Sequence, residues 1–439
     1  MPKTCIMILL DGLGDRSYRE LDNQTPLQAA RTPVLDRIAG NGANGLFHPA
    51  LLGQALPSEN AHFAMLGYDK EDFPGRGALE ALGAGIPLNN NEVAILAHYV
   101  TVSETDTGTL VLTNGKPEIS ADEISALNRT IRDFSSDNIE VCFHHTQGFR
   151  GILTLTGNVT PFVTDSDPMR EGQPLISVKP WRNHAYDTAT RNTATIIVKY
   201  LKWVYRVLCR HPVNTARLEN NRPPVNALVT QRAGRLKKVV RFPEYLGLRG
   251  ISIASGIVYH GLATYLGIDV VKVKDTDRPG EDLAKRIEIA TDLARDYDFI
   301  HVHTKAPDEA AHTKDPIHKT RIIEELDQGI GTVLDRLISR PEQFLVITAD
   351  HSTPSSGPLI HSGEPVPLIF YGKGVRRDNV QNYDEINAAG GSLGLVRGKE
   401  LMYLVLNHLD RAKLHGIMDM PVNQPYWPGQ YDPLCIHDA

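Results

Sequence analysis

Seven side chains of types that bind metal ions are spread through the chain, and most of them follow an apolar run or begin a helix-like one. Folds that alternate strands and helices place their chemistry at the carboxyl ends of the strands, where residues distant in sequence can meet. Three aspartates, three histidines and a serine in such positions predict metal-assisted phosphoryl chemistry. The seven residues are Asp11, Ser58, Asp308, His312, Asp350, His351 and His361.

The strongest local signal is the dipeptide Asp350-His351, which directly follows the apolar run 344–349. His361 comes ten residues later. A turn at the end of a strand does not explain why two metal-binding residue types occur there together. Mixed histidine and carboxylate ligands suit Zn, Mn, Fe or Co better than Ca. We therefore interpret these three residues as ligands.

Two further positions carry carboxylates that could reach a metal. Asp308 and His312 are four residues apart, so on a helix both side chains share one face. The sequence favours a ligand pair there over a solvated cap with a surface histidine. Asp11 ends the first apolar run, but an Asx turn explains that position at least as well.

Ser58 precedes the helix-like run 63–66 and is expected at a helix N-terminus, where backbone N–H groups favour anions. On local sequence alone, a helix cap explains it better than catalysis does. A metal on its oxygen would lower the pKa of the hydroxyl and make it a nucleophile. His301 and His303 alternate with apolar residues, so we expect them in the core or behind the ligands.

The elements that would hold these residues follow from the apolar pattern. A helix is expected at 33–39, because Pro33 fits a first turn and Gly40 a stop. A longer amphipathic helix is expected from 316 to about 339. Buried strands alternate with these helices and predict a largely parallel sheet. The runs expected as strands are 4–10, 299–303, 344–347 and 366–371.

With 439 residues, the chain is too long for one core and predicts two domains. Residues 170–241 hold 15 Lys and Arg against three acids, a charge of +12, so the rest must carry −18 to give the net −6. An amphipathic helix is expected within this segment at 196–208. The expected organisation is a metal-binding core formed by 1–90 and 291–439, with a basic substrate or cap domain inserted at 91–290.

Composition excludes several classes of protein. The net charge of −6 makes the whole chain no obvious nucleic-acid binder, and we interpret the basic segment as a solvated face with substrate cations. No apolar stretch approaches the roughly 18 residues of a membrane span. Residues 1–10 lack a cleavage pattern and predict a strand instead of a signal peptide. The four scattered cysteines argue against a disulfide scaffold, so a cytoplasmic location is expected.

Taken together, the motifs resemble those of the archaeal-type cofactor-independent phosphoglycerate mutases, in the alkaline-phosphatase-like metalloenzyme superfamily. The resemblance runs in order from the first strand to about 397–398. The stretches that carry it are 8–15, 25–30, Ser58 with His62, 66–69, 75–85, 305–309 with His312, 348–354 and 361–367.

The resemblance implies an α/β fold, with a largely parallel sheet flanked by helices and an inserted α/β cap domain. It implies two divalent ions, Mn or Zn with Mg or Co as alternatives. One ion would be held by Asp11, Ser58, Asp350 and His351, and the other by Asp308, His312 and His361. Lys305 would be a catalytic cation beside the substrate. More loosely matched candidates for substrate binding are Arg76, Arg150, Asp165, Asp167, Arg232 and Arg235.

The implied reaction is a glycolytic isomerisation. Ser58 would take the phosphoryl group of 3-phosphoglycerate and return it to the other hydroxyl, giving 2-phosphoglycerate, while the basic insert closes as a cap that excludes water. Two departures from the family pattern, at 57–60 and 111–116, keep related reactions open. These are a phosphatase, a homoserine-kinase-like enzyme and a mutase of another phospho- or phosphono-acid. The expected partner is a small phosphorylated carboxylate, with no nucleic acid or membrane, and the oligomeric state is left open.

Overall fold

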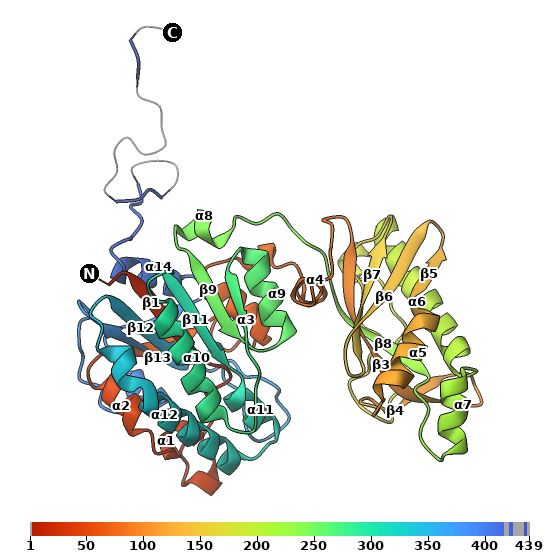
Figure 1. Ribbon diagram of the computed structural model, residues 1–439, viewed down its shortest axis with the longest axis horizontal. Coiled ribbons are helices and arrows are strands. Elements are labelled where there is room, and N and C mark those ends of the chain that lie inside the picture. Colours follow the sequence, from red (N-terminus) through yellow and green to blue (C-terminus); the bar gives the residue numbers. More distant parts are fainter. Residues whose placement is uncertain (1, 417–420, 425–433, 437–439) are drawn as a thin grey trace. The chain divides into compact units, whose positions relative to one another are not determined.

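The computed structural model describes residues 2–416, 421–424 and 434–436 (Figure 1). These residues form two compact units, and each unit contains its own β-sheet. The first unit comprises Met1–Phe73, Val240–Gly256 and Leu266–Ala439. The second comprises Pro74–Val239 and Ile257–Tyr265. None of the helices in the described ranges has the length and apolarity that a membrane crossing requires.

The first unit is built on an eight-stranded sheet in the order β10-β9-β11-β1-β12-β13-β2-β14. All neighbours are parallel except β13, which runs antiparallel to both β12 and β2. The expectation of a largely parallel α/β sheet is therefore confirmed. The strands are β1 (Thr4–Leu10), β2 (Ala43–His48), β9 (Gly250–Ala254), β10 (Asp269–Lys272), β11 (Phe299–Thr304), β12 (Gln343–Thr348), β13 (Val366–Gly372) and β14 (Gly394–Arg397).

The central strand β1 has all seven of its residues buried, as expected of an uncharged strand between two parallel neighbours. It pairs with β11 on one side and β12 on the other. In this register Leu9 lies opposite His303 and Thr348, so the carboxyl ends of all three strands reach the same edge of the sheet. The loops that follow them begin side by side.

Helices flank this sheet, and those expected from the sequence at 33–39 and 316–339 are confirmed. Helix α12 buries the apolar stripe that includes Ile323 and Ile330. It packs closely against α10 at Gly329 and Gly280. A Cβ on Gly329 would lie 2.1 Å from the carbonyl oxygen of Gly280, so a side chain there would not fit. The helices are α1 (Pro26–Ala29), α2 (Pro33–Ala39), α3 (Ser58–Met65), α8 (Phe242–Leu246), α10 (Pro279–Leu293), α11 (Ala306–His312), α12 (Pro316–Ile338), α13 (Glu385–Ala388) and α14 (Glu400–His408).

The second unit has an antiparallel sheet in the order β4-β3-β7-β6-β5, with β8 also paired to β3. Its core includes Tyr99, Phe143 and Tyr200, and the amphipathic helix expected at 196–208 is the second half of α6. The strands are β3 (Val93–Glu104), β4 (Leu110–Asn114), β5 (Asp133–Ser136), β6 (Ile139–Gln147), β7 (Arg150–Thr156) and β8 (Ala227–Gly234). The helices are α4 (Arg76–Gly83), α5 (Ala121–Ile131), α6 (Thr188–Leu208), α7 (Pro212–Glu219) and α9 (Ile257–Leu266).

The boundaries of the two compact units differ from the domain boundaries expected near residues 90 and 290. At the first cut, α4 packs on β3 so closely that a Cβ on Gly77 would lie 2.1 Å from the carbonyl oxygen of Ala94. The helix therefore joins the second unit. At the second cut, β9 and β10 extend the sheet of the first unit through β11, which brings most of 240–290 into that unit.

Candidate metal centre

One group of candidate ligands gathers where β1 and β12 end. Asp11 follows β1, Asp350 and His351 follow β12, and all three are buried. Nε2 of His351 lies 3.5 Å from Oδ1 of Asp11 and 3.1 Å from Oδ2 of Asp350. The Ser58 hydroxyl lies 2.9 Å from the same nitrogen. These four residues were predicted to share one ion, and the structure brings their oxygen and nitrogen atoms to one point.

Ser58 reaches this point because it is the first residue of α3 and does not cap the helix. The residue before the helix is Pro57, and no side chain there bonds a backbone N–H of the first turn. The helix-cap alternative for Ser58 is therefore wrong. Nδ1 of His62, one turn further along, donates to the Ser58 carbonyl oxygen at 2.8 Å and lies 3.4 Å from Oδ2 of Asp350. The hydroxyl of Ser58 thus faces the carboxylates and His351.

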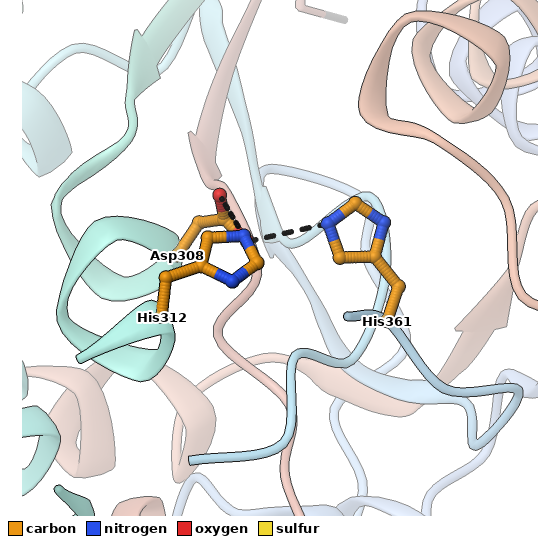
Figure 2. Close-up of side chains that lie close together, drawn as sticks. All are labelled: Asp308, His312 and His361. Atoms are coloured by element: carbon orange, nitrogen blue, oxygen red, sulfur yellow. Dashed lines mark ion pairs between the residues drawn. The ribbon is translucent and has the colours of Figure 1, made fainter. Parts of the chain in front are cut away.

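A second group lies beside the first. Figure 2 shows Asp308 and His312 on α11 and His361 on a loop, with the three side chains pointing toward one another. Nε2 of His312 is 3.2 Å from Oδ2 of Asp308, and Nε2 of His361 is 3.6 Å from Oδ1. Nδ1 of His361 lies 2.8 Å from the carbonyl oxygen of Leu56, which fixes the proton on Nδ1 and leaves Nε2 for a ligand. The rings of His351 and His361 stack with centroids 3.8 Å apart, so the two groups are adjacent.

Each group offers donors that suit a divalent cation. Asp11, Asp350 and His351 have ligand atoms within 4.8 Å of one another, and so do Asp308, His312 and His361. Oδ2 of Asp350 is buried beside Nε2 of His351 at 3.1 Å and Nδ1 of His62 at 3.4 Å, and it accepts no further hydrogen bond from the residues that the structure describes. A buried carboxylate oxygen in that state costs free energy unless a cation compensates it. The residues present therefore fit two metal ions held by nitrogen and oxygen.

The charges of the ligands depend on one another. Burial opposes ionisation of Asp350, but His351 and His62 more than offset it and hold the pKa of Asp350 well below its ordinary value. Burial likewise opposes the charge on His351, but Asp350 and Asp308 raise its pKa overall. The pKa of His361 is lowered, by burial and then by His351. Burial also opposes ionisation of Asp308, but His312 and His351 lower its pKa overall, so Asp308 and Asp350 are ionised at neutral pH, as metal ligands must be.

Histidines of β11 stand behind the ligands, as the sequence analysis expected. Nε2 of His303 lies 3.0 Å from Oδ2 of Asp11, and Nδ1 of His301 lies 3.0 Å from the hydroxyl of Ser252. Burial lowers the pKa of His301 to about 3 and that of His303 well below its ordinary value. Both are therefore neutral, and His303 can donate a hydrogen bond to the Asp11 carboxylate without adding charge.

Lys319 is a supporting residue that the sequence reasoning did not find. Its buried ammonium group donates to Oδ2 of Asp15 at 3.0 Å and to the carbonyl oxygens of Gly14 at 3.0 Å and Thr353 at 2.9 Å. Asp15 also accepts from the backbone N–H and the hydroxyl of Ser355. This cluster ties the loop after β1 to the loop after β12. The sequence feature that could have revealed this residue is the occurrence of a lysine within the apolar stripe of α12.

The substrate-binding candidates lie in the second unit, apart from Lys305, which directly precedes α11. Arg76, Arg150, Asp167 and Arg232 line one cavity of about 570 Å³. The same cavity is lined by His98, Lys116 and Arg170, which sequence reasoning did not single out.

Asp165 and Arg235 are not among the lining residues of this cavity. Arg232 has a φ of 51°, a conformation uncommon for residues with a side chain. Oδ1 of Asp165 accepts a 2.7 Å hydrogen bond from the backbone N–H of Arg232 and helps to hold it there. Asp165 therefore supports the cavity from outside its lining.

Comparison with known proteins agrees with this arrangement. Residues 3–408 match the model of the metalloenzyme superfamily. The chain is 41% identical over 419 residues to 2,3-bisphosphoglycerate-independent phosphoglycerate mutase 2 of Methanocaldococcus jannaschii, with 94% of each chain covered. It is 37% identical to the corresponding mutase of Methanopyrus kandleri, over 95% of this chain and 99% of that one.

Solved structures show the same relationship. The cofactor-independent phosphoglycerate mutase of Thermoplasma acidophilum superposes with a TM-score of 0.64 and 30% identity, over 93% of this chain and 100% of that chain. A protein from Pyrococcus horikoshii superposes with a TM-score of 0.77 and 27% identity, over 95% and 100%. With a family match over nearly the whole chain and relatives above 30% identity, the chain belongs to the metalloenzyme superfamily and, within it, to the 2,3-bisphosphoglycerate-independent phosphoglycerate mutases.

Proposed function

We propose that this protein interconverts 3-phosphoglycerate and 2-phosphoglycerate by phosphoryl transfer through Ser58. The observation that carries the proposal is the position of the Ser58 hydroxyl, 2.9 Å from Nε2 of His351 and engaged in no helix cap. The names of the relatives support the substrate and the reaction. We assign Asp11, Ser58, Asp350 and His351 to one divalent ion, for which Mn or Zn suits the donors.

The other ion is assigned to Asp308, His312 and His361. When bound, the two ions lower the pKa of the Ser58 hydroxyl and stabilise charge on the phosphoryl group in transfer. The Ser58 hydroxyl gives up its proton, and its Oγ forms a bond to phosphorus as the bond from phosphorus to the glycerate oxygen breaks; that oxygen takes up one proton, so the exchange balances. The second half reverses these steps on the other hydroxyl of the glycerate. Lys305 supplies a cation directly before α11, three residues before Asp308.

We assign substrate recognition to the second unit, which would act as the substrate-binding and cap domain. The cavity lined by Arg76, Arg150 and Arg232 offers guanidinium groups, which bind carboxylates and phosphates through paired hydrogen bonds. Asp167 accepts within that cavity, with its Oδ2 3.2 Å from Nε2 of His98. Outside the lining, Asp165 is assigned the support of Arg232 through its hydrogen bond, and Arg235 is kept as a further candidate cation for the substrate. The substrate is therefore a small phosphorylated carboxylate, and we propose a cytoplasmic location for the reaction.

The test is an assay of the full chain, stripped of metal and reloaded with Mn²⁺. Conversion of 3-phosphoglycerate to 2-phosphoglycerate and back is followed alongside release of free phosphate. The proposal predicts interconversion in both directions with little phosphate released. Release of phosphate without interconversion would make the protein a phosphatase and overturn the mutase assignment, while leaving the metal centre in place.

A further inference from the structure

The hydroxyl of Thr353 touches side chains from both groups of ligands. Thr353 is fully buried and lies two residues after His351. Its Oγ1 lies 2.7 Å from Oδ1 of Asp308 and 3.1 Å from Nδ1 of His351. A hydroxyl has one proton to donate and lone pairs to accept. Because an ionised Asp308 can only accept, the hydroxyl donates to Asp308 and accepts the Nδ1–H of His351.

These two hydrogen bonds have consequences on each side. With its proton on Nδ1, His351 keeps the lone pair of Nε2, the atom that faces Ser58 at 2.9 Å. With Oδ1 held by Thr353, Asp308 presents Oδ2 to Nε2 of His312 at 3.2 Å. One hydroxyl thus orients a ligand atom in each group.

The backbone around Thr353 is arranged so that this contact can form. The N–H of Thr353 donates to the carbonyl oxygen of Gly14 at 2.9 Å, and Lys319 donates to the Thr353 carbonyl oxygen at 2.9 Å. Gly12 has a φ of +66°, and a Cβ there would lie 2.6 Å from Oγ1 of Thr353 and 2.7 Å from Cβ of Asp308. Only a glycine leaves space for the two side chains to meet.

We propose that Thr353 is a positioning residue shared by both metal sites, so that one hydroxyl sets the ligand geometry of each. The inference rests on the metal centre in the proposed function, but its test measures metal binding and does not use the reaction. Residues that orient metal ligands in this way change metal affinity by about 10- to 100-fold when they are replaced. A residue that served only one site would change the affinity of that site alone.

The experiment measures Mn²⁺ affinity in the full chain, stripped of metal, from the electron paramagnetic resonance signal of free Mn²⁺. Each site is isolated in turn, by His312→Ala for the group with Asp11 and by Asp11→Asn for the group with Asp308. In both backgrounds, Thr353→Val keeps the side-chain shape and removes the hydroxyl. We expect it to weaken Mn²⁺ binding by about 10-fold or more in each background. Thr353→Ser, which restores the hydroxyl, is expected to recover most of the affinity.

Thr348→Val is the matched control, since Thr348 is also fully buried, lies in the same segment, and donates at 3.0 Å to the carbonyl oxygen of Pro367 instead of to a ligand. We expect it to leave both affinities unchanged. The inference fails if Thr353→Val weakens one site only, or if Thr348→Val has an equal effect. If circular dichroism shows that Thr353→Val does not fold, Thr353→Ala takes its place with the same outcomes. Intact two-site positioning in a chain that does not interconvert phosphoglycerates would contradict the proposed function alone.

Discussion

Two lysine–aspartate pairs with the same shortest distance between nitrogen and oxygen make a sharp test of the buried cluster behind the metal centre. Lys319 and Asp15 lie 3.0 Å apart and both side chains are 0% exposed. Lys399 and Asp69 also lie 3.0 Å apart, but their side chains are 44% and 59% exposed. The perturbation is Lys→Met at each position, which removes the ammonium group and keeps a side chain of similar length.

The expected magnitudes differ because of burial. Removing Lys319 leaves the Asp15 carboxylate buried without its cation, along with two carbonyl oxygens that lose a donor. Breaking a buried pair in this way costs about 3–5 kcal/mol. Removing Lys399 costs about 0.2–1 kcal/mol, because water solvates the remaining carboxylate and screens the pair. Hydrogen exchange of peptides from β1 and β12, measured against urea concentration, reports the free energy of unfolding of this sheet.

A double variant separates the charge from the packing. Asp15→Asn in the Lys319→Met background removes the uncompensated carboxylate, so it is expected to recover part of the lost stability. Equal losses from Lys319→Met and Lys399→Met, both under about 1 kcal/mol, would refute the reasoning. The buried pair of Lys319 and Asp15 would then contribute no more to the free energy of unfolding than an exposed pair does.

Three further predictions follow from the same structure. Ser58→Ala is expected to abolish interconversion and to leave the stability of the metal-free chain unchanged, because Ser58 caps no helix. Ser120→Ala, which removes the cap of α5 at Glu123, is expected to cost about 1 kcal/mol in urea unfolding of the metal-free chain and to leave activity unchanged. The reverse pattern would mean that Ser58 is structural. Burial raises the pKa of Glu385 to about 7 from 4.5, so the folded state holds the extra proton and stability from this group falls as pH rises from 4.5 to 7, by up to about 3 kcal/mol. Glu385→Gln is expected to remove that part of the slope in unfolding measured across this pH range, and an unchanged slope would exclude Glu385 as its source. Chelation is expected to lower the thermal unfolding midpoint, because metal ions at a free concentration of about 100 times Kd stabilise the folded state by about 2.7 kcal/mol. A midpoint that changes neither with chelator nor with added Mn²⁺ would contradict the metal assignment.

Much of the first unit could be predicted because its sequence signals are local. An uncharged run such as 4–10 predicts a buried strand, and the pairing of β1 with β11 and β12 then brings Asp11 and Asp350 to one edge. The pair Asp308 and His312 follows from helical spacing alone. Ser58 was different, since only the structure distinguishes a helix cap from a side chain facing His351.

Other features depend on contacts between distant segments, which a single sequence does not encode locally. Lys319 looks like an exception in an apolar stripe until Asp15, some 300 residues earlier, is placed beside it. Thr353 lies within the stretch 348–354 that carries the family resemblance, but its contact with Asp308 requires that α11 and the loop after β12 meet. The domain boundary expected near 290 differs from the boundary of the first compact unit. The reason is that β9 pairs with β11, a contact between distant segments that appears only in the three-dimensional structure.

The central claim is that Ser58 carries the phosphoryl group between the two hydroxyls of the glycerate. The most direct measurement is acid quenching of the Mn²⁺-loaded protein during turnover with 3-phosphoglycerate, followed by mass spectrometry of its peptides. The account predicts one phosphoryl group on the peptide that contains Ser58, and none on the same peptide of Ser58→Ala. Continued interconversion with Ser58 unmodified, or with the phosphoryl group on another residue, would contradict it.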